Sequence, residues 1–282
     1  MLFRSISLSE TVGSVTIVVM GDVYSHGHHE SVLRSHTWRT AENSAGYLLP
    51  HLHAGMDLLD VGCGPGTITV DLATRVSPGR VVGIDASADV VVQAARGAAG
   101  TDVSFAVGDV YAIDVPDASF DVVHAHQVLQ HLTDPVRALT EMRRVMKPGG
   151  IVAVRDSDYA AFAWAPRIPL LDRWMAIYHG ITLRNRAEAD AGRYLFGWAR
   201  TAGFTDVAAT STNWTFATPE DREWWGGLWA DRVLASSYGE QAVAYGLTDR
   251  AELEAIAAAW HQWADDEGAC FIVVHAEVLA RS

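Results

Sequence analysis

The sequence predicts an α/β fold built on a doubly wound, mostly parallel sheet. Apolar, β-branched runs alternate with segments of helical composition across residues 54–158, and the first run breaks into a glycine-rich turn. Strands that alternate with helices at this spacing are typical of a parallel sheet with helices on both faces. The first three runs also end at or beside an aspartate, which predicts a ligand site at one edge of the sheet.

The first strand and its turn occupy residues 58–66, Leu-Leu-Asp-Val-Gly-Cys-Gly-Pro-Gly. Three alternating glycines tolerate backbone angles that a Cβ forbids, so a ligand can lie directly on the main chain. The spacing predicts a helix over 67–76 whose free amide groups face the same crevice. A dinucleotide-binding turn has a glycine or alanine at the position of Thr67. Asp60, just before the turn, suits a ligand with a positive group and repels a pyrophosphate.

The next two strands repeat the pattern of an apolar run followed by an acid. Residues 81–85 end in Asp85, about 20 residues after the glycine turn, where a βαβ unit presents a carboxylate to ribose hydroxyls. Residues 88–99 between the runs have helical composition. The third run, 103–108, is followed by Asp109. Three acids at successive strand ends are more specific than a glycine turn alone.

The fourth strand is predicted over 120–126, and the fifth over 151–154. A helix between them begins with Asp134 as N-cap and Pro135 in its first turn. The segment Lys-Pro-Gly-Gly at 147–150 ends this helix. Together these elements complete the parallel half of the sheet.

The last hundred residues predict two further strands and added helices. Residues 159–177 leave the fifth strand as an irregular-to-helical excursion, and 194–202 read as a helix that returns to the sheet. A sixth strand is expected near 207–216, two helical patterns follow within 225–260, and a seventh strand covers 270–279. An aromatic stripe at helical spacing usually packs inward, so most of the tryptophans are expected in the core of the added helices.

These motifs resemble the class I S-adenosylmethionine-dependent methyltransferases, and within them the ubiquinone/menaquinone-biosynthesis methyltransferase-like group. Four segments carry the resemblance: Leu-Asp-Val-Gly-Cys-Gly-Pro-Gly-Thr, Val-Val-Gly-Ile-Asp, Val-Gly-Asp-Val and Arg-Val-Met-Lys-Pro-Gly-Gly. The match is strong over 23–158 and continues weakly through 192–207. It implies a seven-stranded Rossmann-like sheet whose last strand runs antiparallel between the fifth and sixth.

The resemblance also implies S-adenosylmethionine as cofactor and assigns roles to individual residues. Asp60 and the turn backbone would hold the methionyl part, and Asp85 would accept from both ribose hydroxyls. Asp109 would accept from the adenine amino group, while His126 and Gln127 would border the sulfonium. The full cofactor set that we expect is Tyr24, His28, Arg39, Asp60, Gly62, Cys63, Gly64, Asp85, Ala86, Gly108, Asp109, Val110, His126 and Gln127.

The resemblance suggests a single methyltransferase domain with an added upstream segment. Residues 1–22 read as an extension, with Met20 as a candidate natural start, and residues 23–53 read as an N-terminal helical lid. The remaining divisions are a cofactor-binding half at 54–158, a helical cap for the acceptor at 159–192 and 217–268, and a closing helix and strands at 193–216 and 269–282.

Two histidines are candidates for an acceptor-side base. His124 and His126 share one face of the fourth strand because strand side chains alternate, and a satisfied core role is expected for His124. His126, at the carboxyl end of its strand, and His131, shortly after it, are the candidate catalytic residues. In-line methyl transfer also proceeds by alignment and exclusion of water. The sequence leaves the acceptor open among O, N, S and C, in a pocket suited to a flat or apolar small molecule.

Composition excludes several function classes. The 282 residues carry a net charge of −13, which argues against nucleic-acid binding because that affinity needs clustered Lys and Arg. Two cysteines are too few for a disulfide framework, and the Cys63 thiol reads as a small residue in the turn. The histidines at 26–29 lack a ligand cluster at metal spacing, so no metal is expected. No run is long enough to span a bilayer.

We therefore expect a cytoplasmic enzyme, monomer or homodimer, that methylates a small molecule without stable membrane insertion. Two alternatives stay open from the sequence. An NAD-dependent oxidoreductase shares the fold class, although Asp60 and Thr67 disfavour it. A non-catalytic regulator that retains the cofactor fold is the second alternative.

Overall fold

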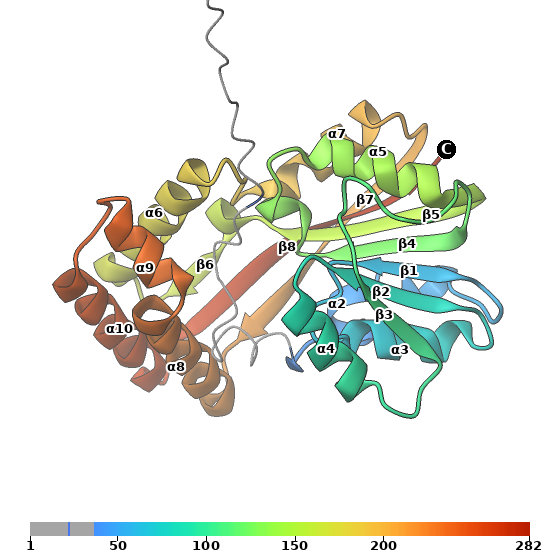
Figure 1. Ribbon diagram of the computed structural model, residues 1–282. Coiled ribbons are helices and arrows are strands. Elements are labelled where there is room, and N and C mark those ends of the chain that lie inside the picture. The colour runs from blue at the N-terminus through green and yellow to red at the C-terminus, as the bar shows by residue number, and fades with distance from the viewer. Residues whose placement is uncertain (1–21, 23–36) are drawn as a thin grey trace, which may run out of the picture.

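The computed structural model describes residue 22 and residues 37–282, so Tyr24, His28, the first part of the expected lid (23–36) and residues 1–21 of the expected extension lie outside the described residues. The described chain forms one mixed sheet in the order β3-β2-β1-β4-β5-β8-β6, with β7 paired to β8 (Figure 1). The strands are β1 Leu58–Val61, β2 Val81–Asp85, β3 Val103–Val107, β4 Phe120–His126, β5 Met146–Ser157, β6 Ala163–Ala165, β7 Asp206–Phe216 and β8 Cys270–Arg281.

The first five strands are parallel to one another, and β8 is antiparallel to each of its neighbours. One edge of β8 pairs with β7 along its length. The other edge pairs with β5 as far as Ser157 and His275, and then with β6. The predicted parallel sheet with an antiparallel last strand between the fifth and sixth is thus confirmed. The unexpected strand β6 is three residues long and satisfies the edge of β8 that β5 leaves unpaired.

Helices cover both faces of the parallel half. They are α2 Ala41–Ala45, α3 Thr67–Val76, α4 Ala88–Gly97, α5 Pro135–Val145 and α7 Leu195–Thr201. Figure 1 shows α5 and α7 on one side of the sheet and α2 and α3 on the other. Buried apolar residues of α5 and α7 join one core cluster, whereas those of α2 and α3 join another. This two-sided burial explains the continuous apolar strands.

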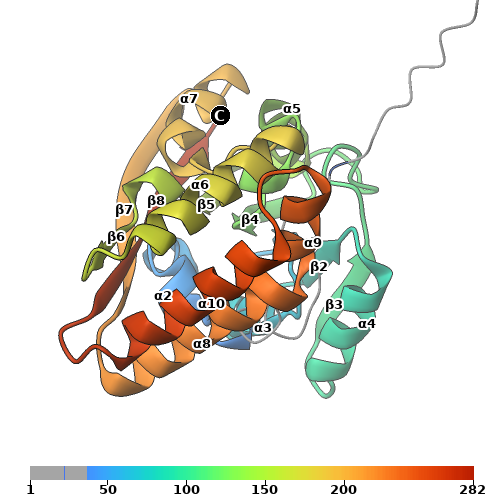
Figure 2. The same cartoon turned by 90° about the vertical axis from the view of Figure 1, so that its left-hand side faces the viewer.

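Four further helices form a separate layer, which we call the helical cap: α6 Pro169–Arg184, α8 Pro219–Ala235, α9 Ser237–Ala244 and α10 Arg250–Asp265. Figures 1 and 2 show the cap beside the carboxyl ends of the parallel strands, with β8 running from the sheet into it. Its core is strongly aromatic, and Trp174, Trp229, Trp260 and Trp263 are almost fully buried. The prediction that most tryptophans pack inside the added helices holds for these four.

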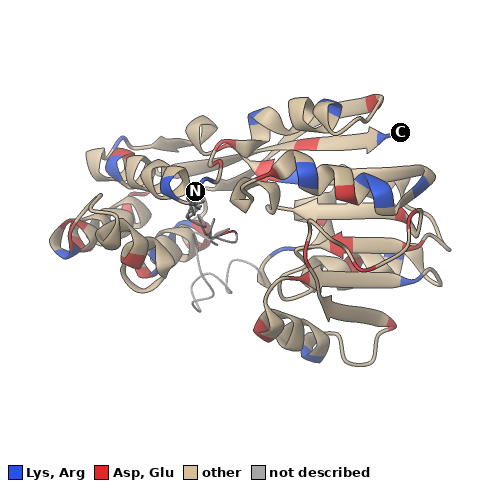
Figure 3. Cartoon of the chain, turned by 45° about the horizontal axis from the view of Figure 1, so that its top comes forward, with Lys and Arg blue, Asp and Glu red and all other residues tan. Residues whose placement is uncertain are grey.

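Charged side chains are mixed over the described elements. In α5, for example, Glu141 lies among Arg137, Arg143 and Arg144, and Figure 3 shows blue and red positions alternating there. None of the described helices has the length and apolar character needed to cross a membrane.

Candidate active site

A cavity of about 700 Å³ opens where the parallel strands end beside the helical cap. One part of its wall is formed by the loops after the strands, and the other by aromatic residues of the cap and of β7. Every predicted site residue within the described chain lines this cavity. They are Arg39, Asp60, Gly62, Cys63, Gly64, Asp85, Ala86, Gly108, Asp109, Val110, His126, Gln127 and His131.

The glycine turn requires glycine at each alternate position. The φ angles of Gly62, Gly64 and Gly66 are 66°, 55° and 83°, in the left-handed region where a side chain is strained. A Cβ added at Gly62 would lie 2.4 Å from Cγ2 of Val128, in the segment after β4. The turn therefore approaches the neighbouring strand end as closely as a bare backbone allows.

Asp85 is held in a fixed orientation by the backbone. Its Oδ2 accepts from the Gly64 amide at 3.1 Å, and its Oδ1 accepts from the Ser87 amide at 2.9 Å. Each carboxylate oxygen keeps a second lone pair, so the half-buried group can still accept from a ligand hydroxyl. The second strand end is thus tied directly to the glycine turn.

Asp60 is buried and has two partners from the protein itself. Thr69 Oγ1 donates to Oδ2 at 2.5 Å, and His124 Nδ1 lies 2.7 Å from Oδ1. Because an ionised carboxylate only accepts, the Nδ1 hydrogen belongs to this contact. His124 is fully buried, as a core histidine would be, but it also supports a site carboxylate. This role was not predicted, because it arises from the pairing of β1 with β4, which places His124 beside Asp60.

Asp109 differs from the other two acids because it is exposed. Its Oδ1 accepts from the Tyr111 amide at 2.8 Å, which shapes the loop after β3. Gly108 and Val110 flank it in the cavity wall.

Gln127 connects several groups at the end of β4. Its φ of 54° is unusual for a residue with a side chain. Its Nε2 donates to Ser157 Oγ at 2.8 Å and to His275 Nε2 at 2.9 Å, and Arg39 donates to its Oε1 at 2.5 Å. Arg39 is therefore connected to the site through Gln127, which was also predicted as a site residue. Ser157 and His275 were not predicted, because neither carries a local motif.

His126 and His131 are both neutral at physiological pH in this site. Burial lowers the pKa of His126 well below its usual range, and the charges of Arg39 and Arg155 add to the effect. Neither ring nitrogen of His126 has a hydrogen-bond partner among the described residues. Burial, with Arg39, lowers the pKa of His131 to about 3. A neutral imidazole has a lone pair that can accept a proton, and the lowered pKa also means that each ring holds that proton weakly.

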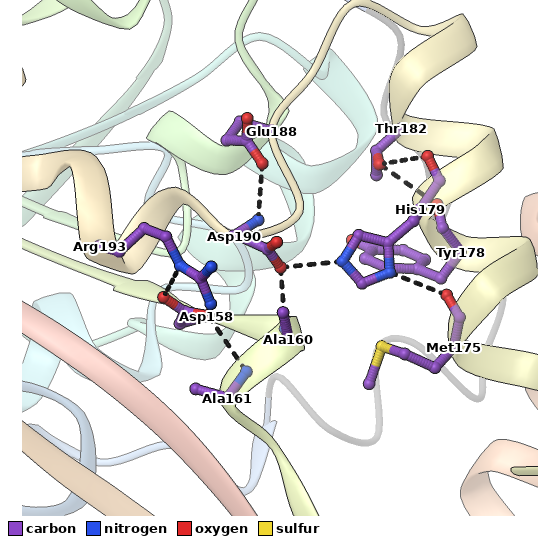
Figure 4. Close-up of polar contacts among 10 residues, drawn as sticks. All are labelled: Asp158, Ala160, Ala161, Met175, Tyr178, His179, Thr182, Glu188, Asp190 and Arg193. Atoms are coloured by element: carbon purple, nitrogen blue, oxygen red, sulfur yellow. Dashed lines mark hydrogen bonds and ion pairs between the residues drawn. The ribbon is translucent and has the colours of Figure 1, made fainter. Parts of the chain in front are cut away.

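The aromatic part of the wall comes from distant segments: Tyr159, Phe162, Trp214, Trp225 and Trp229. The segment that carries Tyr159 is held by the polar contacts in Figure 4. Arg193 donates to both oxygens of Asp158, and Asp190 accepts from the Ala160 amide and from His179 Nε2. The Tyr159 ring also stacks on Tyr178 of α6, with centroids 4.1 Å apart. This wall is therefore ordered before any ligand enters.

The Cys63 thiol lies in the wall of the cavity. Burial raises the pKa of the Cys63 thiol above its usual range, which keeps it protonated at neutral pH. Within residues 37–282 and at residue 22, His, Cys, Asp and Glu side chains form no group of three or more with metal-ligand geometry.

The fold is a Rossmann-like α/β fold with a cavity at the carboxyl ends of its parallel strands, and comparison with known proteins identifies the family. The model of the methyltransferase domain family matches residues 52–194. A methyltransferase of Schizosaccharomyces pombe, named as uncharacterized, is 32% identical over 91% of this chain and 95% of its own length. The chain belongs to the methyltransferase domain family.

Two further relatives bear on the predicted resemblance. The ubiquinone/menaquinone biosynthesis C-methyltransferase of Bdellovibrio bacteriovorus is 37% identical over 36% of this chain and 45% of its own. Phosphoethanolamine N-methyltransferase 2 of Haemonchus contortus, solved in complex with S-adenosyl-L-methionine, shares the fold with a TM-score of 0.51 and 17% identity. That match covers 82% of this chain and 49% of the other. The predicted resemblance to the methyltransferases, with relatives in the ubiquinone/menaquinone-biosynthesis group among them, is confirmed.

Proposed function

We propose that the protein transfers a methyl group from S-adenosylmethionine to a small organic acceptor held in the aromatic part of the cavity. The observation that carries this proposal is the continuity of the cavity. Strand-end acids and the glycine turn form one part of its wall, and buried aromatic rings form the other. A sulfonium donor and an acceptor in one closed space would meet in line, with water excluded.

The strand-end carboxylates fit the proposed cofactor by their chemistry. Asp60 is buried and held by Thr69 and His124, which gives a fixed negative charge near a cationic group of the ligand. Asp85 is oriented by two backbone amides and has lone pairs left for the ribose hydroxyls. Asp109, exposed in the next loop, would accept from the adenine amino group. A solved structure with a similar fold, in complex with S-adenosyl-L-methionine, supports the proposal.

The bound cofactor would supply an electrophilic methyl group on a positively charged sulfur, and the neutral thioether is a good leaving group. Gln127 and Arg39, joined by their hydrogen bond, would border the methionyl end. Tyr24 and His28 remain candidates for the same end. The turn backbone at Gly62, Cys63 and Gly64 would pack against it.

His126 is the acceptor-side base in this proposal. It lines the cavity, is 6% exposed and is neutral because of burial and the nearby guanidinium groups. An acceptor hydroxyl would pass its proton to a ring nitrogen while the oxygen takes the methyl group, so the sulfur leaves as a neutral thioether. His131, in the same wall, is the second candidate. A carbon acid as acceptor would use the same proton transfer.

The proposal is tested with S-adenosylmethionine labelled in its methyl group. We expect the pure protein to transfer label to at least one member of a library of phenols, hydroxy acids and polyketide-like compounds, and to release S-adenosylhomocysteine in equal amount. Tight binding of the cofactor with no transfer to any compound would favour a regulator instead. Absence of cofactor binding would contradict the proposal altogether.

A further inference from the structure

The charged groups of the cavity wall come from several parts of the fold. Its carboxylates are those of Asp60 in β1, Asp85 in β2, Asp109 in the loop after β3, and Asp22. Its guanidinium groups belong to Arg39 and to Arg232 of α8. Arg39 donates to Gln127 at the end of β4, whereas Arg232 comes from the helical cap. The helical cap therefore contributes a positive charge to the cavity wall, from a different element than the strand-end carboxylates.

Arg232 lies among the aromatic rings. Its side chain is buried to 5% exposure, and its guanidinium carbon is 4.6 Å from the centre of the Trp229 ring. Burial raises the pKa of Tyr159, while its hydrogen bond with Tyr178 and the positive charge of Arg232 act against that rise. Trp229 and Tyr159 line the same cavity. A flat molecule against these rings would lie within reach of the guanidinium.

A second buried arginine on the same helix lies outside the cavity wall. Arg222 of α8 is 7% exposed. It donates to the carbonyl oxygen of Ala217, just before α8, and to that of Ala264 in α10. It does not line the cavity. Arg232 differs because its buried charge faces a space large enough for a ligand, and a planar guanidinium binds a carboxylate through two parallel hydrogen bonds.

We propose that Arg232 binds an anionic group of the methyl acceptor, so that the substrate class is aromatic or flat apolar molecules that carry a carboxylate. This inference rests on the proposed function and specifies its acceptor. The ring system of the substrate packs against Tyr159, Trp225 and Trp229, and the carboxylate pairs with Arg232. Arg39, hydrogen-bonded to Gln127, would border the methionyl end of the cofactor. Arg232 then determines specificity and takes no part in the transfer of the proton or the methyl group.

The test uses calorimetry on the full chain loaded with S-adenosylhomocysteine. The probes are matched pairs of carboxylate and carboxamide: 4-hydroxybenzoate with 4-hydroxybenzamide, salicylate with salicylamide, and 1-hydroxy-2-naphthoate with its amide. We expect at least one carboxylate to bind roughly tenfold or more tightly than its amide, since charge-assisted hydrogen bonds are the stronger ones. Equal affinity within every pair, or no binding by any probe, overturns the inference.

Substitutions at Arg232 test whether this residue causes the preference for the carboxylate. Arg232→Met should abolish the preference for the carboxylate, and Arg232→Lys should retain part of it, while the affinity for S-adenosylhomocysteine stays unchanged in both. Arg222→Met is the matched control, which should lose stability but keep the preference. A preference that persists in Arg232→Met, or a loss of S-adenosylhomocysteine affinity there, contradicts the assignment. If the wild-type protein fails to bind S-adenosylhomocysteine, the proposed function itself fails.

Discussion

His124 donates its Nδ1 hydrogen to Asp60 Oδ1 over 2.7 Å, with both side chains buried between β1 and β4. Thr69 donates to the other oxygen of the same carboxylate. Asp60 is therefore fixed at the strand end by its neighbours, without a ligand. The fourth strand thus supports the acid that the first strand presents.

His124→Leu removes one of the two side-chain donors to the Asp60 carboxylate. The free energy of unfolding should fall by about 1–3 kcal/mol, the cost of an unsatisfied buried group, and the affinity for S-adenosylhomocysteine should fall as well. His124→Asn keeps a donor near the Nδ1 position and should recover much of both. Urea denaturation and calorimetry measure the two quantities. A Leu variant as stable as the wild type would show that the contact contributes nothing.

Asp85→Asn should weaken the binding of S-adenosylhomocysteine by about 1.5–3 kcal/mol, because it removes a charged acceptor that the Gly64 and Ser87 amides orient. The matched variant Asp109→Asn should have a smaller effect, since that carboxylate is exposed and screened by water. Calorimetric titration gives both values. A larger loss for Asp109→Asn than for Asp85→Asn would reverse the proposed order.

His126→Phe should reduce turnover by roughly 10²–10⁴-fold if the acceptor is a hydroxyl group, the range typical of general base catalysis. Affinity for the cofactor product should change little, because the ring is proposed to serve the acceptor. Single-turnover rates with labelled cofactor measure the effect, with His131→Phe compared in the same assay. A normal rate for His126→Phe would mean that His131 is the base or that the reaction needs no histidine base.

His131 should make the free energy of unfolding depend on pH. Its pKa in the folded chain is about 3, lowered from 6.5 by burial, so the unfolded chain binds a proton first as the pH falls. Stability from this group is therefore lost between pH 6.5 and pH 3, and by pH 5 the loss is about 2 kcal/mol. Urea denaturation of wild type and His131→Phe at pH 7.5 and pH 5 checks this. An identical pH dependence in the variant would contradict the burial argument.

Local patterns predicted the cofactor half of the fold well. The helix expected over 67–76 is α3, Thr67–Val76, and the fourth strand expected over 120–126 is β4. Glycine angles, caps and apolar alternation are decided by neighbours in the sequence, which is why these bounds agree. β6 was not predicted because three residues form a strand only when β8 offers them an unpaired edge.

The aromatic part of the cavity wall depends on distant contacts. Arg232, Tyr159 and Trp214 come from a cap helix, the loop after β5 and an edge strand, and no spacing in the sequence relates them. Helical periodicity indicated which tryptophans are buried, but it could not tell a core ring from a ring at the cavity wall. His275 and Ser157 join the site because β8 pairs with β5.

Calorimetric titration of the wild-type chain with S-adenosylhomocysteine and, separately, with NAD⁺ tests the central claim most directly. The glycine turn with Asp60 before it and Thr67 after it predicts saturable binding of S-adenosylhomocysteine at one site per chain, and no heat from NAD⁺. Binding of NAD⁺ with none of S-adenosylhomocysteine would contradict the account.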